Sequence, residues 1–163
     1  MLADSVGLGK ETTIQARIAS LPLIGEWLAS QSYKPDKKKY GDELRSAAQN
    51  AASITDELID ILYRFERSPD HAGMMLKILR LWFDWTGQKK SVYGPILRKL
   101  PSIRNPALIS WGRQDATVPL SHGESAAKSL PDARLEVIDR CAHVPMFEQP
   151  EIFNSLVLEF LKN

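Results

Sequence analysis

Hydrophobic and polar positions change their spacing near residue 105 of the chain. Beyond that point, residues 107–111 are a short apolar run bounded by turn residues, a pattern typical of a strand in a parallel sheet, and residues 134–138 are predicted to form a second strand. Residues 121–130 are predicted to form a helix, and the stretch that follows Pro150 repeats apolar residues at helical spacing. The segment 105–163 is therefore predicted to fold as strand, helix, strand and helix.

Two details of these helices can be predicted. Ser121 and Glu124 have capping-box spacing, so they are expected to cap the first helix. The final helix is expected to bury one face, which carries Phe153, Leu156, Val157, Phe160 and Leu161.

Residues 12–100 show helical spacing and contain no convincing strand. Shorter helices are expected at 21–29 and 93–100, with a turn at 68–70 between two longer ones. The longer helices are marked by two apolar sets: Leu58, Ile61, Leu62 and Phe65, then Met75, Ile78, Leu79 and Trp82. Residues 31–40 are predicted to form a polar, solvated connector containing Lys34, Lys37, Lys38 and Lys39.

Composition narrows the class of protein. The chain is 44% hydrophobic and 25% charged, which is ordinary for a globular domain. A net charge of +1 gives no electrostatic reason to expect a nucleic-acid or membrane partner. The single cysteine, Cys141, excludes an internal disulfide, and neither a membrane-spanning stretch nor a signal-peptide layout is found. We therefore expect a cytoplasmic location.

Two residues suggest chemistry. Asp115 follows the first predicted strand and His143 follows the second. Because parallel strands joined by a helix place their following loops at one sheet edge, we expect these side chains to face each other. An Asp bonded to a His fixes the tautomer of the His and stabilises its protonated form. Singly, such an Asp is more often a turn former and such a His is more often solvated, but their joint placement favours an acid–base pair.

The sequence around these residues resembles the C-terminal signature of the α/β-hydrolase superfamily, of the serine hydrolase type. The matching residues are Pro-Ala-Leu-Ile-Ser-Trp-Gly-Arg-Gln-Asp at 106–115, Val118-Pro119, and Cys-Ala-His-Val-Pro-Met-Phe-Glu-Gln-Pro-Glu-Ile-Phe at 141–153. The resemblance implies that Asp115 is the triad acid and His143 the general base, in the chain order of that family. Leu-Ala-Asp-Ser-Val-Gly-Leu-Gly at 2–9 is similar to the end of the family's strand six.

The resemblance implies an α/β fold class with a defined layout: the C-terminal part of an α/β-hydrolase fold, a short parallel βαβα unit preceded by a helical cap. Residues 1–11 would be the end of strand six and its exit turn, 12–101 the cap, and 102–163 the core part with strands seven and eight. A cap of this family covers the active site, so Met74, Met75, Trp82, Phe83 and Trp85 would line a substrate pocket. The alternative is that they form the cap's own core.

The family's nucleophile motif, Gly-x-Ser-x-Gly, is absent from the chain. Ser5 and Ser125 are near misses: Ser5 has too few residues before it for a strand, and Ser125 lies inside a predicted helix. Asp4 occupies a place where some relatives carry the triad acid, although Asp115 has the commoner one.

Several other polar residues have simpler explanations. Cys141 lacks a second Cys–His pair, so we predict no metal, and no cofactor is indicated. His71 and His122 are expected at the surface. Glu148 is expected to fix the loop of His143 rather than to act as an acid or base.

Two functions remain open. The first is a hydrolase acting on an ester, a thioester or a carbon–carbon bond next to a ketone of a small organic substrate. The chain would then be a truncated fragment, inactive alone because it lacks the nucleophile and the oxyanion donors. The second is a non-catalytic binding or partner-complementing module of the same fold, with an open sheet edge that invites self-association. The Asp115 and His143 pair favours the first, whereas Val144, where ring-cleavage-product hydrolases carry an aromatic residue, argues against that subfamily.

Overall fold

Two parallel strands of six residues each form the centre of the fold. The structure, a computed structural model, describes residues 1–32, 36–68 and 70–162. Strand β4 (Ala107–Gly112) pairs along its whole length with β5 (Ala133–Ile138), and the short β1 (Leu2–Ala3) pairs with the other side of β4. The sheet order is β1-β4-β5, with both pairs parallel. The apolar start of the chain is thus long enough to add a third strand.

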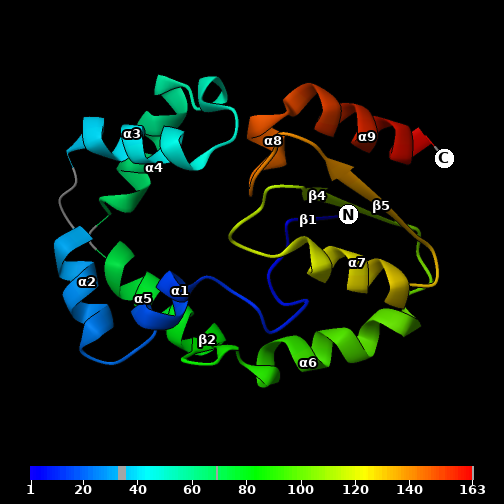
Figure 1. Ribbon diagram of the computed structural model, residues 1–163, viewed down its shortest axis with the longest axis horizontal. Helices are drawn as coiled ribbons and strands as arrows, with labels where there is room; N and C mark the ends of the chain where they lie inside the picture. The colour runs from blue at the N-terminus through cyan, green and yellow to red at the C-terminus, as the bar shows by residue number, and fades with distance from the viewer. Residues whose placement is uncertain (33–35, 69, 163) are drawn as a thin grey trace.

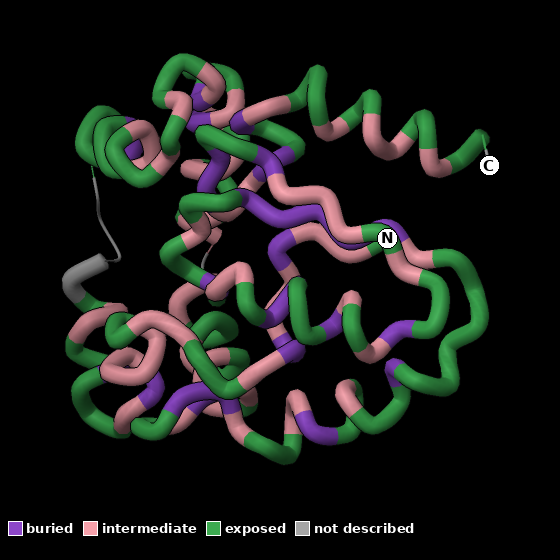
Figure 2. Tube along the Cα trace, turned by 45° about the vertical axis from the view of Figure 1, so that its right-hand side comes forward, coloured by how far each residue is buried: buried purple, intermediate pink, exposed green. Residues whose placement is uncertain are grey.

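Helices cover both faces of this sheet (Figure 1). Helix α7 (Leu120–Ser129) joins β4 to β5 and packs against both strands. It lies on the same side as α6 (Lys90–Lys99), while α8 (Pro145–Glu148) and α9 (Pro150–Lys162) lie on the other side. Because β4 is covered from both sides, its residues from Leu108 to Gly112 are all buried, as Figure 2 shows for the central trace.

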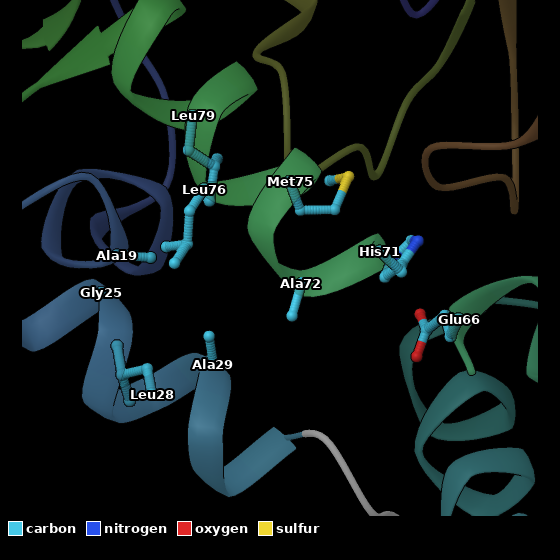
Figure 3. Close-up of a pocket in the computed structure, with 10 residues that line it drawn as sticks. All are labelled: Ala19, Gly25, Leu28, Ala29, Glu66, His71, Ala72, Met75, Leu76 and Leu79. Atoms are coloured by element: carbon cyan, nitrogen blue, oxygen red, sulfur yellow. The ribbon is translucent and has the colours of Figure 1, made fainter. Parts of the chain in front are cut away.

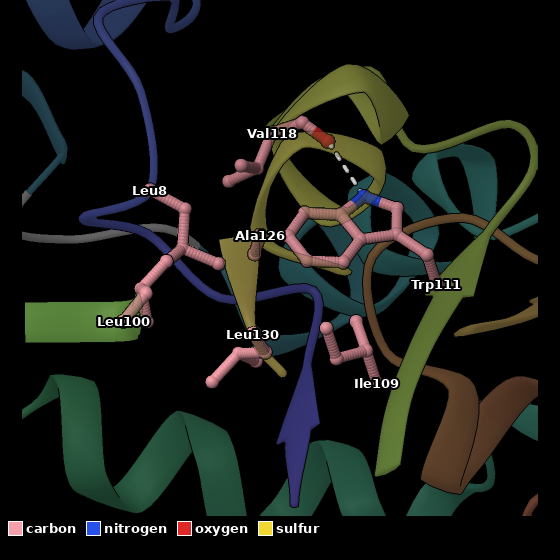
Figure 4. Packing of buried hydrophobic residues seen from close by; sticks show 7 residues of the cluster. All are labelled: Leu8, Leu100, Ile109, Trp111, Val118, Ala126 and Leu130. Atoms are coloured by element: carbon pink, nitrogen blue, oxygen red, sulfur yellow. Dashed lines mark hydrogen bonds between the residues drawn. The ribbon is translucent and has the colours of Figure 1, made fainter. Parts of the chain in front are cut away.

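The main core gathers around Trp111 of β4 (Figure 4). This side chain is 0% exposed, and its indole Nε1 donates to the backbone oxygen of Val118 at 3.1 Å. A buried indole N–H needs such an acceptor, so the bond fixes the start of α7 against the strand. The cluster brings together five elements or loops and contains Leu8, Leu100, Ile109, Trp111, Val118, Ala126 and Leu130.

The segment between β1 and β4 is mainly helical. Thr13 caps the first helix by accepting from the backbone N–H of Ala16, and Thr55 caps another by accepting from Leu58. A second apolar cluster of Tyr40, Ile54 and Ile59 holds two of these helices together. The elements are α1 (Ile14–Ala19), α2 (Ile24–Ser32), α3 (Lys37–Ala47), the 3-10 turn η1 (Ala51–Ser53), α4 (Asp56–Glu66), α5 (His71–Trp82), the hairpin of β2 (Phe83–Asp84) and β3 (Gly87–Gln88), α6, and η2 (Leu100–Ser102).

Three sequence predictions about local structure are wrong. Helix α7 begins after Pro119 without a side-chain cap, so Ser121 and Glu124 form no capping box. The β2–β3 hairpin lies where no strand was expected, because its strands are too short to show a periodicity. The predicted connector at 31–40 is helical at both ends, with Lys37, Lys38 and Lys39 in the first turn of α3. Lys34 and Pro69 lie outside the described residues.

The apolar faces of three helices are less buried than their spacing predicts. In α4 the buried residue is Ile59, whereas Ile61 and Phe65 are each 56% exposed. In α5, Met75 and Ile78 remain exposed, and in α9 the same holds for Leu161. Spacing identifies an apolar face, but burial also requires a neighbouring element that covers the face.

His122 is buried, contrary to the prediction of a surface position. Its Nε2 lies 2.9 Å from a carboxylate oxygen of Glu11, 111 positions away in the chain. His71 is half-buried and packs edge-on against the ring of Phe65. Among the helices described, none is long and apolar enough to cross a membrane.

Candidate active site

The ends of β4 and β5 bring Asp115 and His143 together. Strand β4 ends at Gly112 and β5 at Ile138, and the loops that follow them meet at the same edge of the sheet. There His143 Nδ1 lies 2.9 Å from Asp115 Oδ2, which is a hydrogen-bonding distance. The two side chains predicted to face each other are therefore bonded partners.

Asp115 is held rigidly. Its Oδ1 accepts from the backbone N–H groups of Thr117 at 2.7 Å and Val118 at 3.0 Å, and its side chain is 0% exposed. Burial alone would raise the pKa of this carboxyl. The hydrogen bonds from His143, Val118 and Thr117 outweigh burial and lower the pKa below its ordinary value, so Asp115 is ionised at neutral pH.

His143 has the arrangement of a general base. The carboxylate of Asp115 accepts a hydrogen bond from Nδ1–H, which leaves Nε2 with a free lone pair. The hydrogen bond to Asp115 raises the pKa of His143, while burial opposes the shift. Its side chain is 37% exposed, so a reacting group can reach the imidazole.

The loop that carries His143 is clamped by Glu148. This carboxylate is 0% exposed, and its Oε1 accepts from the backbone N–H groups of Ala142 at 3.0 Å and Val144 at 3.3 Å, on either side of His143. Its Oε2 accepts from the N–H of Gln49 at 2.7 Å. Asn50 adds a bond from its side-chain amide to the Glu148 backbone oxygen. One buried carboxylate thus ties the His143 loop to the helical segment.

A second link joins the two site loops directly. The side-chain oxygen of Gln114 accepts from the N–H of Cys141 at 3.1 Å, and the N–H of Gln114 donates to the Cys141 oxygen at 3.0 Å. Sequence reasoning missed Gln114 because nothing in its local pattern distinguishes it from an ordinary turn residue.

Asp4 lies beside this pair. It is 4% exposed, and its Oδ1 accepts from the N–H of Gly112 at 2.9 Å. Burial, together with the charge of Asp115, raises the pKa of Asp4 to about 7. The sequence left Asp4 open as an alternative acid, but the carboxylate that accepts the hydrogen bond of the His143 ring is that of Asp115.

The side chains of this chain that could be considered as nucleophiles are poorly placed or poorly ionised for that role. Ser5 directs its hydroxyl to the backbone oxygen of Ala3, and Ser125 lies inside α7. Cys141 is 0% exposed, and burial raises the pKa of its thiol to about 12, so it is not a thiolate at neutral pH. The described residues contain no group of three or more His, Cys, Asp and Glu side chains arranged to hold a metal.

An apolar pocket of about 230 Å³ lies between α2 and α5 (Figure 3). It is lined by Ala19, Gly25, Leu28, Ala29, Glu66, His71, Ala72, Met75, Leu76 and Leu79. Met75 is the one residue of the predicted pocket set that belongs to this lining.

The other members of that set lie elsewhere. Met74 is 42% exposed, Trp82 is half-buried and Phe83 is buried. Trp85 is 55% exposed, with the guanidinium of Arg17 over its ring. A substrate-binding role for Met74, Met75, Trp82, Phe83 and Trp85 stays a prediction.

Comparisons with known proteins agree on one family. A family model described as alpha/beta hydrolase fold matches residues 30–150. A 2-hydroxy-6-oxo-6-phenylhexa-2,4-dienoate hydrolase of Delftia acidovorans is 38% identical over 112 residues, covering 68% of this chain and 36% of that protein. A 2-hydroxy-6-oxononadienedioate/2-hydroxy-6-oxononatrienedioate hydrolase of Burkholderia vietnamiensis is 31% identical over 159 residues, covering 95% of this chain and 52% of that protein.

Solved structures give the same result for the fold. A meta-cleavage product hydrolase from Pseudomonas fluorescens IP01 superposes with a TM-score of 0.61 at 27% identity, covering 82% of this chain and 48% of that one. A 2-hydroxy-6-oxo-6-phenylhexa-2,4-dienoate hydrolase from Rhodococcus sp. strain RHA1 gives 0.65 at 21% identity, covering 99% and 54%. The chain therefore spans about half or less of the length of these proteins. Val144 argues against the subfamily of ring-cleavage-product hydrolases, yet a meta-cleavage product hydrolase is among the proteins that this chain is similar to.

Proposed function

The chain belongs to the α/β-hydrolase family, and on that premise we propose that it carries the acid and base of a hydrolase that cleaves a carbon–carbon bond next to a ketone. The observation that supports this most is the 2.9 Å bond between His143 and the buried carboxylate of Asp115. A binding module has no need of a buried carboxylate aligned with a half-exposed imidazole.

The substrate class follows from the names of similar proteins. The Delftia and Burkholderia hydrolases are named for 2-hydroxy-6-oxo dienoates, which are conjugated acids with a ketone at carbon six. Hydrolysis of a ketone must break a bond from the carbonyl carbon to a neighbouring carbon. We propose the same class of substrate for this chain, ahead of the esters and thioesters that other members of the fold accept.

The proposed mechanism assigns the chain two of three triad roles. A serine from outside the chain attacks the ketone, and Nε2 of His143 takes the proton from that serine. Asp115 stabilises the resulting imidazolium and keeps its Nδ1 oriented. As the carbon–carbon bond breaks, His143 returns the proton to the departing carbon, and an acyl-serine remains. Water then releases the acid, with His143 again acting as base.

The same proposal assigns residues 12–101 the role of a cap above this site. The bonds from Gln49 and Asn50 to Glu148 support it, because they fasten that segment to the loop of His143. Alone, the chain is expected to be nearly inactive, since it has no Gly-x-Ser-x-Gly turn and removing a triad nucleophile leaves only weak catalysis.

The decisive experiment begins with the DNA upstream of the Met1 codon. If the frame continues and encodes Gly-x-Ser-x-Gly after an apolar strand, the longer protein should hydrolyse 2-hydroxy-6-oxo-6-phenylhexa-2,4-dienoate. The reaction is measured as the loss of the dienoate absorbance. His143→Ala should then reduce kcat at least about 1000-fold. Asp132→Asn, a substitution at an exposed residue, is the control and should leave kcat unchanged.

Two results would count against the proposal. An unchanged rate in His143→Ala would remove the base from the mechanism. A stop codon just before Met1, together with an inactive chain, would instead favour the non-catalytic module.

A further inference from the structure

We propose that Asp4 is a positioning residue that, in its neutral carboxylic acid form, donates a hydrogen bond to Asp115, an inference that rests on the proposed roles of Asp115 and His143. Asp4 is not assigned the role of the triad acid. It would act on the base only through Asp115.

The backbone places Asp4 against the end of β4. Its N–H donates to the Ser110 oxygen at 3.2 Å, extending the β1–β4 pairing by one residue. Its Oδ1 then accepts from the N–H of Gly112 at 2.9 Å. The φ angle of Asp4 is 40°, in the left-handed region that Asp and Asn tolerate better than most residues. The Asp4 carboxyl is therefore fixed to Gly112, which lies three residues before Asp115 in the chain.

The second carboxyl oxygen of Asp4 lacks a donor. Among the described residues no group donates to Oδ2, which is fully buried. An ionised oxygen without a donor is costly in the interior. Asp115 belongs to the same turn, since its N–H donates to the Gly112 oxygen at 3.2 Å, but its carboxylate can only accept hydrogen bonds and repels an ionised Asp4. A proton on Asp4 Oδ2 removes both problems, because it satisfies the orphaned oxygen and replaces a repulsion by a hydrogen bond.

The surrounding charges favour the same protonation state. The charges of Asp115 and His143 act on the Asp4 carboxyl, and a charge on Asp4 also acts on the thiol of Cys141. Glu148 adds a further carboxylate near His143. If Asp4 were ionised as well, the negative charge around His143 would hold its proton more tightly and make it a slower donor to the leaving group. A neutral Asp4 leaves one charge on the pair and gives Asp115 a further fixed donor.

The test is made on the full 163-residue chain and does not use activity. Carbon-13 NMR of the Asp4 carboxyl, followed against pH, should show a midpoint near 7 rather than near the ordinary 3.8. Two variants are compared by the downfield proton signal of the His143 Nδ1–H, which reports its bond to Asp115. Asp4→Asn keeps a neutral donor and tolerates the positive φ, so it should preserve that signal. Asp4→Leu removes the donor and should broaden or shift it.

Each outcome bears on the proposal. A carboxyl midpoint near 3.8 in the unmodified chain overturns it without any variant. Loss of the His143 Nδ1–H signal in Asp4→Asn overturns it too, because a neutral donor at this position would then not be sufficient to hold the Asp115–His143 bond. An unchanged signal in Asp4→Leu overturns the positioning role, because the bond would then not need a donor at this position. Asp132→Asn, an exposed change, serves as the control for assignment and folding. Failure of the proposed function would look different: the longer protein would not hydrolyse the dienoate, while the midpoint of Asp4 and the signals of the two variants would still be those expected here.

Discussion

At the scale of single residues, the position of His143 depends on Glu148. Its two oxygens accept from three backbone N–H groups, those of Gln49, Ala142 and Val144. Glu148→Gln turns one acceptor into a donor that must face one of those N–H groups. We expect a loss of about 1–3 kcal/mol in the free energy of unfolding, measured with urea.

The control for this variant is Glu124→Gln, at an exposed position of α7, which should change the same free energy by less than about 0.5 kcal/mol. Equal effects in the two variants would mean that Glu148 is not a clamp. Exchange of the Gln49 amide hydrogen should also accelerate in Glu148→Gln and stay unchanged in Glu124→Gln.

Asp4 also makes the stability of the chain depend on pH. Its pKa is raised from 3.8 to about 7, so the folded state holds a proton that the unfolded state releases over this range. The stability that this proton contributes is fully present below pH 3.8 and is lost as the pH rises through about 7. The raised pKa of His143 acts in the same direction above its ordinary 6.5, whereas the lowered pKa of Asp115 removes stability as the pH falls below 3.8. Stability should therefore peak in mild acid.

Asp4→Asn tests this dependence because it cannot ionise. At about 1.4 kcal/mol per pKa unit, the variant should be more stable than the unmodified chain by up to about 4 kcal/mol at pH 8, and by little near pH 4. Urea unfolding at both pH values measures the difference. A gain that is equal at the two pH values would show that Asp4 does not titrate in between.

At the scale of elements, the contact between β4 and the His143 loop leaves no room for a side chain at Gly112. A Cβ there would lie 1.8 Å from the Ala142 backbone oxygen and 2.6 Å from that of Cys141. Both oxygen atoms belong to backbone that is hydrogen-bonded to Glu148 and Gln114, so they cannot move away from an added Cβ without breaking those bonds. Gly112→Ala should therefore lower the free energy of unfolding by about 3 kcal/mol or more, measured by thermal melting.

Gly73 provides the matched comparison. It lies inside α5, and a Cβ built there meets nothing within 4 Å. Gly73→Ala should therefore stabilise the chain by about 0.5–1 kcal/mol, through the lower conformational entropy of Ala. A loss in Gly73→Ala as large as in Gly112→Ala would show that the effect is not steric.

Much of this element arrangement was predictable from the sequence. The buried run of β4, the strand pattern of β5 and the loops that follow them are local patterns, and they placed Asp115 opposite His143. The resemblance to the α/β-hydrolase family is confirmed, and so is the fold class. Contacts between distant positions were not predictable, because the pairing of Glu148 with Gln49 and that of His122 with Glu11 leave no local pattern.

Errors in the helical segment have a different origin. The hairpin of β2 and β3 is too short for a two-residue period to show. In α4 the predicted Leu58 and Leu62 pack against the cluster shared with α3, but the buried side chain there is Ile59, which was not in the predicted set.

At the scale of the whole molecule, the sheet leaves an edge that another chain can use. Strand β1 stands at the outside of the order β1-β4-β5 in the described part of the chain. The N–H of Asp4 points to β4, so in an extended strand the backbone groups of Ala3 point the other way. Large apolar side chains are exposed as well, among them Leu23 at 83% and Leu161 at 72%. Both features favour association.

We therefore expect sedimentation velocity to show species larger than the 18.3 kDa monomer, increasing with concentration. Ala3→Pro removes the outward N–H without breaking a bond to β4, so it should shift the distribution toward monomer if the strand edge is the contact. Leu161→Lys should do so if the apolar face of α9 is the contact instead. A monomer with a cooperative melt at every concentration would contradict both, because it would mean that three short strands and their helices are sufficient for a stable, self-contained fold.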